Sequence, residues 1–208
     1  MKRWFLVLLV CVALMAQANA QNTVPSIRQE YQGVQQNIRL MMQEDGIPPE
    51  YYHLHVVQNL PGTGLHDENI HMFYGELPSE EEGDPYPPHF LHFVTAKYNF
   101  AVREYYEEFL YDDKGQVKFI YIREPNIDVP NFQEFRLWYD GPRLLQFMVK
   151  ATDDPDVFNT EVIPASAFKQ VYLGKTIPTE YDDVCKGYLG RSKQYLEMFK
   201  GIDDNTHL

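Results

Sequence analysis

The sequence predicts an α+β fold: a curved antiparallel β-meander of about six or seven strands with an N-terminal and a C-terminal helix packed on one face. Three observations predict this fold class. One amphipathic segment lies near each end of the chain, short segments rich in β-branched and aromatic residues lie between them, and turn sequences join several of these segments. Strands that follow one another without intervening helices favour α+β over alternating α/β.

The N-terminal helix is predicted at residues 24–44, where apolar residues recur at three- and four-residue steps and Pro25 lies in the first turn. The C-terminal helix is predicted at residues 179–200, where Thr179 and Asp182 form a loose capping box. Its apolar stripe consists of Tyr181, Cys185, Tyr188, Ser192, Tyr195 and Phe199.

The segments between the helices are predicted to be strands joined by hairpin turns. Gly115 and Gly141 supply the positive φ that such turns need. Pro142 has no N–H to donate and is expected to begin its strand. A short helix is expected at residues 164–173, and residues 203–207 are expected to be frayed. The predicted strands are residues 51–58, 69–76, 90–98, 102–112, 116–123, 132–140 and 143–150.

The first 20 residues have the features of an export signal. Lys2 and Arg3 precede an apolar run, and Ala18-Asn19-Ala20 matches the small residues at which signal peptidase cleaves. The apolar run is shorter than the roughly 20 residues of a membrane-spanning helix. We therefore expect residues 1–20 to be a signal peptide, residues 21–208 to be a single α+β domain, and the protein to be periplasmic or extracellular, with no membrane span after cleavage.

The composition excludes several function classes. Hydrophobic residues make up 44% of the chain and aromatic residues 14%, which is enough for a globular core. The net charge of −12 repels the phosphate backbone, so nucleic acid is not an expected partner. The chain has no G-x-S-x-G turn, no P-loop and no C-x-x-C motif. Cys185 is left as the only cysteine after signal cleavage, and we expect it to be buried and inert rather than reactive.

Histidines cluster in the first predicted strands. His53 and His55 are two residues apart, so their rings would project from one face of a strand, and His71 on the next strand could complete a zinc site. No H-E-x-x-H pattern accompanies them, and His89 and His92, three residues apart, would point to opposite faces. The alternative is that these histidines are half-exposed sheet residues or rings bonded to backbone carbonyls.

Aromatic residues are dense on the predicted hairpins. Rings exposed on one sheet face would supply contact area for a ligand at low cost in conformational entropy. The alternative is that the rings pack against each other across strands. The candidate ligand-binding residues are Tyr105, Tyr111, Tyr121, Trp138 and Tyr139.

Acidic residues lie on the same strands. Two of them could form the carboxylate pair that glycoside hydrolysis requires. Cross-strand ion pairs with Lys118, Arg123 and Arg136 on a solvated face would explain them equally well. The acidic residues concerned are Glu104, Glu107, Glu108 and Glu134.

The stretch from residue 103 to 150 resembles a hairpin pattern found in small uncharacterised exported bacterial proteins. It carries Glu104-Tyr105-Tyr106, an Asp-x-x-Gly turn at residues 112–115, and Arg136-Leu137-Trp138-Tyr139-Asp140-Gly141. Pro142 departs from the pattern, in which a flexible polar residue is usual. The resemblance implies an exported protein with a meander, and it implies no activity.

These observations favour a non-enzymatic exported protein that binds its ligand through an aromatic-rich sheet face. The expected partner is a small molecule, a glycan or an envelope protein, and no cofactor is expected. The alternative is a metal-dependent hydrolase that uses zinc at the His53 and His55 cluster. Edge strands of the sheet could pair between subunits to form a homodimer.

Overall fold

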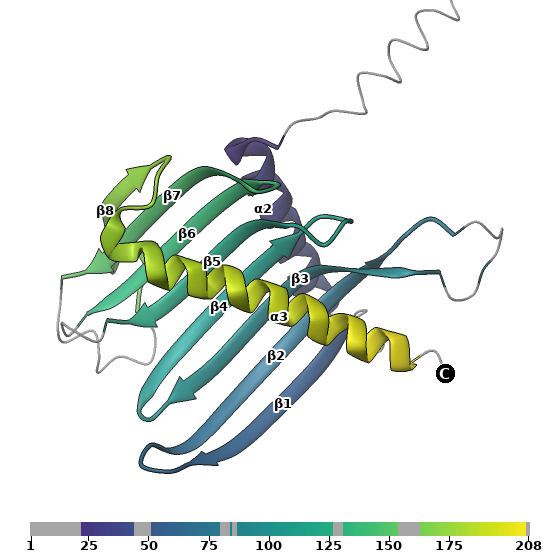
Figure 1. Cartoon of the computed structure of the whole chain (residues 1–208), viewed down its shortest axis with the longest axis horizontal. Helices are drawn as coiled ribbons and strands as arrows, with labels where there is room; N and C mark the ends of the chain where they lie inside the picture. Colours follow the sequence, from purple (N-terminus) through teal and green to yellow (C-terminus); the bar gives the residue numbers. More distant parts are fainter. Residues whose placement is uncertain are drawn as a thin grey trace, which may run out of the picture.

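The computed structural model describes residues 22–43, 51–79, 84, 87–126, 131–153 and 163–206. Its main element is an eight-stranded antiparallel sheet in which each strand pairs with the next along the chain (Figure 1). The predicted meander is confirmed, although the strand count is eight. The strands are β1 (Tyr51–Leu60), β2 (Gly64–Glu76), β3 (His89–Phe100), β4 (Arg103–Tyr111), β5 (Val117–Pro125), β6 (Phe132–Asp140), β7 (Arg143–Thr152) and β8 (Phe168–Gly174).

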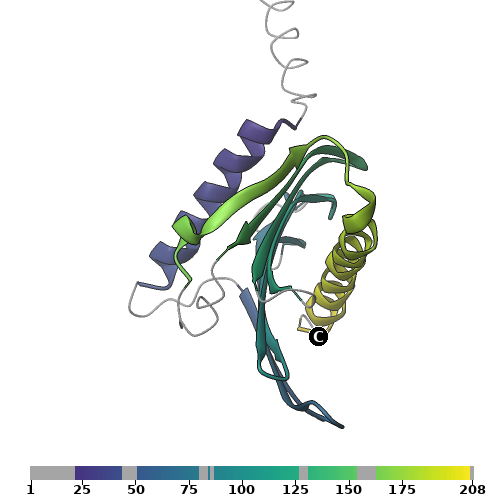
Figure 2. The same ribbon diagram turned by 90° about the vertical axis from the view of Figure 1, so that its left-hand side faces the viewer.

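Two long helices cover the sheet, and they lie on opposite faces (Figure 2). These are α2 (Val24–Met41) and α3 (Asp182–Thr206). The prediction that both helices pack on one face is therefore wrong. The reason is that the strands are apolar on both sides: Phe109 packs in the core under α3, and its neighbour Leu110 packs in the core under α2. Each face must be covered to keep these side chains from water.

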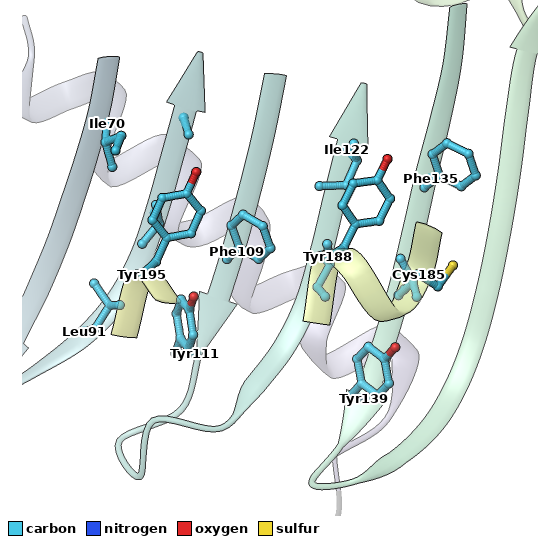
Figure 3. Close-up of a cluster of buried hydrophobic side chains, with 14 of the residues drawn as sticks. Ile70, Leu91, Phe109, Tyr111, Ile122, Phe135, Tyr139, Cys185, Tyr188 and Tyr195 are labelled. Carbon is cyan, nitrogen blue, oxygen red and sulfur yellow. The ribbon is translucent and has the colours of Figure 1, made fainter. Parts of the chain in front are cut away.

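The periodicity of both helices correctly identified the residues that face the sheet. On α2, Ile27 is fully buried, and a capping box between Thr23 and Ser26 begins the helix. On the other face, Cys185, Tyr188 and Tyr195 of α3 lie over the sheet (Figure 3). The cluster under α2 contains Ile27, Phe73, Phe93, Leu110, Phe119, Trp138 and Met148.

Three local predictions require correction. The segment predicted as a helix at residues 164–173 forms only the short 3-10 turn Ala165–Ala167 and then the strand β8. The backbone of β8 pairs with the N–H and C=O groups on the outer edge of β7, which would otherwise lack partners. Residues 203–206, expected to fray, are the last turn of α3, where Asp203 accepts a hydrogen bond from the Tyr52 hydroxyl at 2.7 Å. Pro142 lies inside the turn before β7 rather than beginning the strand.

The predicted signal peptide at residues 1–20 lies outside the described residues. Within the part of the chain that is described, neither helix has a stretch long and apolar enough to cross a membrane.

Candidate functional site

An open groove lies between α3 and the turns that join β4 to β5 and β6 to β7. Its volume is about 600 Å³, within the range of roughly 300–1,000 Å³ that is usual for small-molecule sites. Most of the lining is apolar, which is also usual for such sites. The sheet and its turns contribute Tyr111, Gly115, Gln116, Val117, Tyr139, Gly141 and Pro142, and α3 contributes Leu189, Ser192, Lys193 and Leu196.

The turn between β4 and β5 is built so that α3 can approach it closely. The Asp112 carboxylate accepts the backbone N–H groups of Lys114 and Gln116 at 3.0 and 2.7 Å. Gly115 adopts a positive φ of 75°, and a Cβ at that position would lie 3.0 Å from Leu196 Cδ2. Only glycine meets both demands without strain. The Asp-x-x-Gly sequence thus fixes one wall of the groove.

Two tyrosines of the sheet line this groove, and their hydroxyls differ in their bonding. The Tyr111 hydroxyl donates to the backbone carbonyl of Ser192 at 2.8 Å and so ties the sheet to α3 (Figure 3). The Tyr139 side chain is 4% exposed, and its hydroxyl has no hydrogen-bond partner among the described residues. Burial raises the pKa of Tyr139, so the hydroxyl remains a donor. An unsatisfied buried group of this kind costs about 1–3 kcal/mol.

A lysine supplies positive charge at the side of the groove. Lys193 is exposed on α3, between two lysines of the same helix that pair with carboxylates. Lys186 pairs with Asp182, and Lys200 pairs with Glu197. The ion pairs that α3 lysines form within the described ranges involve Lys186 and Lys200 and do not include Lys193. Its ammonium group is therefore available to a negatively charged group that enters the groove.

The other three candidate aromatic residues do not reach this groove. Tyr105 lies on the α3 face and stacks on the Tyr98 ring with centroids 5.0 Å apart. Tyr121 lies on the α2 face, where its hydroxyl donates to Glu134 at 2.7 Å. Trp138 is buried under α2. The five predicted residues thus divide between the two faces of the sheet, each of which carries a helix in the described structure.

Cys185 is buried, as predicted. Burial raises the pKa of its thiol to about 12, so the thiolate form is disfavoured.

The histidines of the candidate zinc site form pairs rather than a cluster. The rings of His53 and His71 stack with their centroids 4.3 Å apart. His55 instead contacts Asp67, with 3.0 Å between Nε2 and Oδ2. Among the described side chains, no three histidine, cysteine or acidic residues come together in a way that could hold a metal ion.

The remaining histidines of the cluster contact acidic, carbonyl or aromatic groups of other elements. His89 lies against Asp203 of α3 at 2.8 Å, and His92 lies near Glu30 of α2 at 3.7 Å. The two rings therefore point to opposite faces of β3, as their spacing predicts. His66 contacts a backbone carbonyl through Nδ1 at 2.7 Å, which is the alternative that the sequence left open.

Two adjacent glutamates of β4 are buried, one on each face of the sheet. Glu107 faces α3, where it accepts hydrogen bonds from the Tyr98 hydroxyl at 2.8 Å, Arg191 Nε at 2.8 Å and the Tyr195 hydroxyl at 3.3 Å. Glu108 faces α2. Because the two carboxylates are separated by the sheet, they cannot act together on one substrate as a catalytic pair.

Glu108 is enclosed by neutral donors. The Tyr106 hydroxyl donates to it at 2.6 Å, Gln35 Nε2 donates at 2.9 Å, and the Tyr31 hydroxyl also donates. Burial raises the pKa of Glu108, although these hydrogen bonds act in the opposite direction. The expectation of a solvated acidic face is wrong for this residue and for Glu107. The sequence does contain a signal for this burial. Two consecutive glutamates in the middle of an aromatic-rich strand project to opposite faces of the sheet, because side chains alternate along a strand.

No protein-family model, curated protein or solved structure matches the chain. The assignment of function therefore rests on the geometry of the site.

The buried Glu108 carboxyl gives a prediction for the pH dependence of stability. A raised folded-state pKa stabilises the fold below the unfolded-state pKa of about 4.3, and this contribution is lost as the pH rises through the folded-state pKa. The loss is about 1.4 kcal/mol for each unit by which the two pKa values differ. In urea unfolding from about pH 5 to about pH 8, Glu108→Gln is expected to lose less stability with rising pH than the unsubstituted protein.

The control for this measurement is Glu104→Gln, on the same strand but with an exposed side chain. It is expected to keep the pH dependence of the unsubstituted protein. Equal slopes for the Glu108 variant and the unsubstituted protein would contradict the prediction.

Proposed function

We propose that the protein is an exported, non-enzymatic binding protein whose ligand is a small amphipathic molecule held in the groove beside α3. The observation that carries this proposal is the Tyr139 hydroxyl, which is buried in the groove lining without a hydrogen-bond partner in the described structure. A buried polar group of this kind is stabilised when a ligand supplies the missing acceptor.

The chemistry of the lining defines the ligand. Leu189, Leu196 and Val117 favour an apolar body. Tyr139 favours a hydrogen-bond acceptor, and Lys193 favours a negative charge. A carboxylate on an apolar chain supplies both, because one of its oxygens can accept from Tyr139 while its charge faces Lys193.

Two further features support the proposal. The N-terminal sequence has the order of an export signal, with basic residues, an apolar run and Ala18-Asn19-Ala20. The buried carboxylates Glu107 and Glu108 are occupied by hydrogen bonds and lie on opposite faces, which supports a binding role over a catalytic one.

The test is calorimetric titration of the purified protein with dodecanoate, compared with the variant Tyr139→Phe. The unsubstituted protein is expected to bind dodecanoate saturably, with one molecule bound per chain. The variant keeps the ring and removes only the donor, so we expect it to lose about 1 kcal/mol of binding free energy, a factor of roughly five in Kd.

The matched control is Tyr172→Phe. The Tyr172 hydroxyl donates to the Thr176 carbonyl at 2.9 Å, on the same sheet face but outside the groove lining. This variant is expected to bind dodecanoate as the unsubstituted protein does. Absence of saturable binding, or equal Kd values for Tyr139→Phe and the unsubstituted protein, would reject the proposed site.

A further inference from the structure

The edge strand β1 lacks the features that usually prevent edge strands from pairing with other chains. Among the described strands it pairs only with β2, and its ten residues, Tyr51–Leu60, include no lysine, arginine, acidic residue, proline or glycine. Its register with β2 runs from end to end without a bulge. Natural edge strands are protected by charge, proline, bulges or a short length. A long, regular and uncharged edge is therefore unusual.

The exposed apolar residues of this region lie on both sides of the same edge. Val56 and Val57 are consecutive, so they project from opposite faces of β1, and both are exposed, Val57 by 55%. Leu65 of β2 is exposed beside them. Figures 1 and 2 show that this end of the β1–β2 hairpin extends beyond both helices. No described helix covers these side chains.

The opposite edge of the sheet differs in each respect. β8 has seven residues, and a bulge interrupts its register with β7 between Val149 and Lys150. It carries Lys169, which pairs with Asp153. These are the protective features that β1 lacks.

We propose that β1 pairs antiparallel with β1 of a second copy of the chain, so that one continuous sheet crosses a two-fold axis. The sequence of β1 is compatible with itself: a two-fold axis at Val56 sets this residue against its symmetry mate and sets Tyr52 against Leu60. Two copies of the chain repel each other because each carries a net charge of −12. Pairing through β1 avoids direct contact between like charges, because β1 has no acidic or basic side chain other than histidine. Pairing β1 with itself also closes the assembly at two copies, whereas pairing β1 with β8 would build an open fibre.

This interface leaves the proposed ligand groove open in both copies. The groove lies at the end of the sheet where β4 turns into β5 and β6 into β7, and the exposed valines lie toward the other end, near the turn between β1 and β2. The proposed dimer and the proposed ligand site are therefore independent, and an experiment can reject one proposal without rejecting the other.

The test is the molar mass of the purified full-length protein in solution, measured by light scattering over a range of micromolar concentrations. We expect a dimer for the unsubstituted protein. We expect Val57→Lys to weaken dimerisation by about tenfold or more, because a lysine side chain on an edge strand opposes pairing with another strand. The control is Val171→Lys on β8, where the valine is 59% exposed. This variant is expected to remain dimeric.

Hydrogen exchange of the unsubstituted protein keeps the test independent of any variant. Backbone amides of β1 are expected to become more protected as the protein concentration rises, while those of β8 stay unchanged. A monomer at all concentrations, a Val57→Lys protein that dimerises normally, or loss of the dimer in Val171→Lys would overturn the proposal.

Discussion

Replacing Glu107 with alanine is expected to destabilise the fold by about 3 to 5 kcal/mol, the cost of removing one partner of a buried ion pair. The carboxylate is fully buried between β4 and α3 and accepts three hydrogen bonds. Alanine would leave the hydroxyls of Tyr98 and Tyr195 without this acceptor. It would also remove the nearest negative charge from Arg191, whose Nε lies 2.8 Å from the carboxylate.

Arg191 makes this effect large because its other contacts depend on the same arrangement. Its guanidinium lies 4.8 Å from the centroid of the Tyr98 ring, and Nη2 donates to the Tyr195 hydroxyl at 2.7 Å. Its second carboxylate partner is Glu68, at 3.3 Å. The loss of Glu107 therefore weakens a contact that fixes the middle of α3 to β2, β3 and β4.

Urea unfolding followed by circular dichroism measures this effect, with Glu104→Ala as the control. Glu104 lies on the same strand and pairs with Lys97 at the surface, so its loss is expected to cost at most about 1 kcal/mol. Glu107→Gln keeps an acceptor oxygen and the volume of the side chain, and is expected to cost less than alanine. A Glu107→Ala protein as stable as the Glu104→Ala protein would contradict the buried network.

The helices could be predicted from the sequence, but not the faces that they cover. The three- and four-residue spacing from Val24 to Ile38 and from Tyr181 to Phe199 identifies the buried stripe of each helix without reference to the sheet. Alternation along β4 separates Phe109 from Leu110, yet it does not indicate that each face has its own helix. That depends on how the chain enters and leaves the sheet, which local patterns do not encode.

The candidate site could be predicted only in part, because local sequence patterns do not encode which distant segments come together. Tyr111 and Tyr139 were identified from aromatic density, and both line the groove. Tyr105 had the same signal and lies outside the lining. The groove depends on the close approach of α3 to Gly115, a contact between residues far apart in the sequence. The Tyr139 hydroxyl has no hydrogen-bond partner within the described residues. This property depends on what surrounds the hydroxyl in three dimensions, so no sequence pattern could single it out.

Replacing Trp138 with alanine is expected to destabilise the protein by about 3 to 5 kcal/mol, as is typical when a large aromatic side chain is removed from a core. Trp138 is 2% exposed and packs against Phe119, with ring centroids 5.2 Å apart. The Arg28 guanidinium of α2 lies 4.8 Å from its ring centroid. The cavity left by alanine would lie between α2 and the sheet, and Arg28 would lose its cation–π partner.

Two measurements separate this structural role from the role in ligand binding that the sequence suggested for Trp138. Hydrogen exchange is expected to accelerate in α2 while α3 remains protected, because the two helices pack on opposite faces. Dodecanoate binding to the folded variant is expected to be unchanged, since Trp138 does not line the groove. Val102→Ala, at a side chain 96% exposed, is the control and is expected to leave stability unchanged. A Trp138→Ala protein that kept its stability but bound dodecanoate more weakly would instead place the ligand on the α2 face, because only a ring in contact with the ligand would produce that combination.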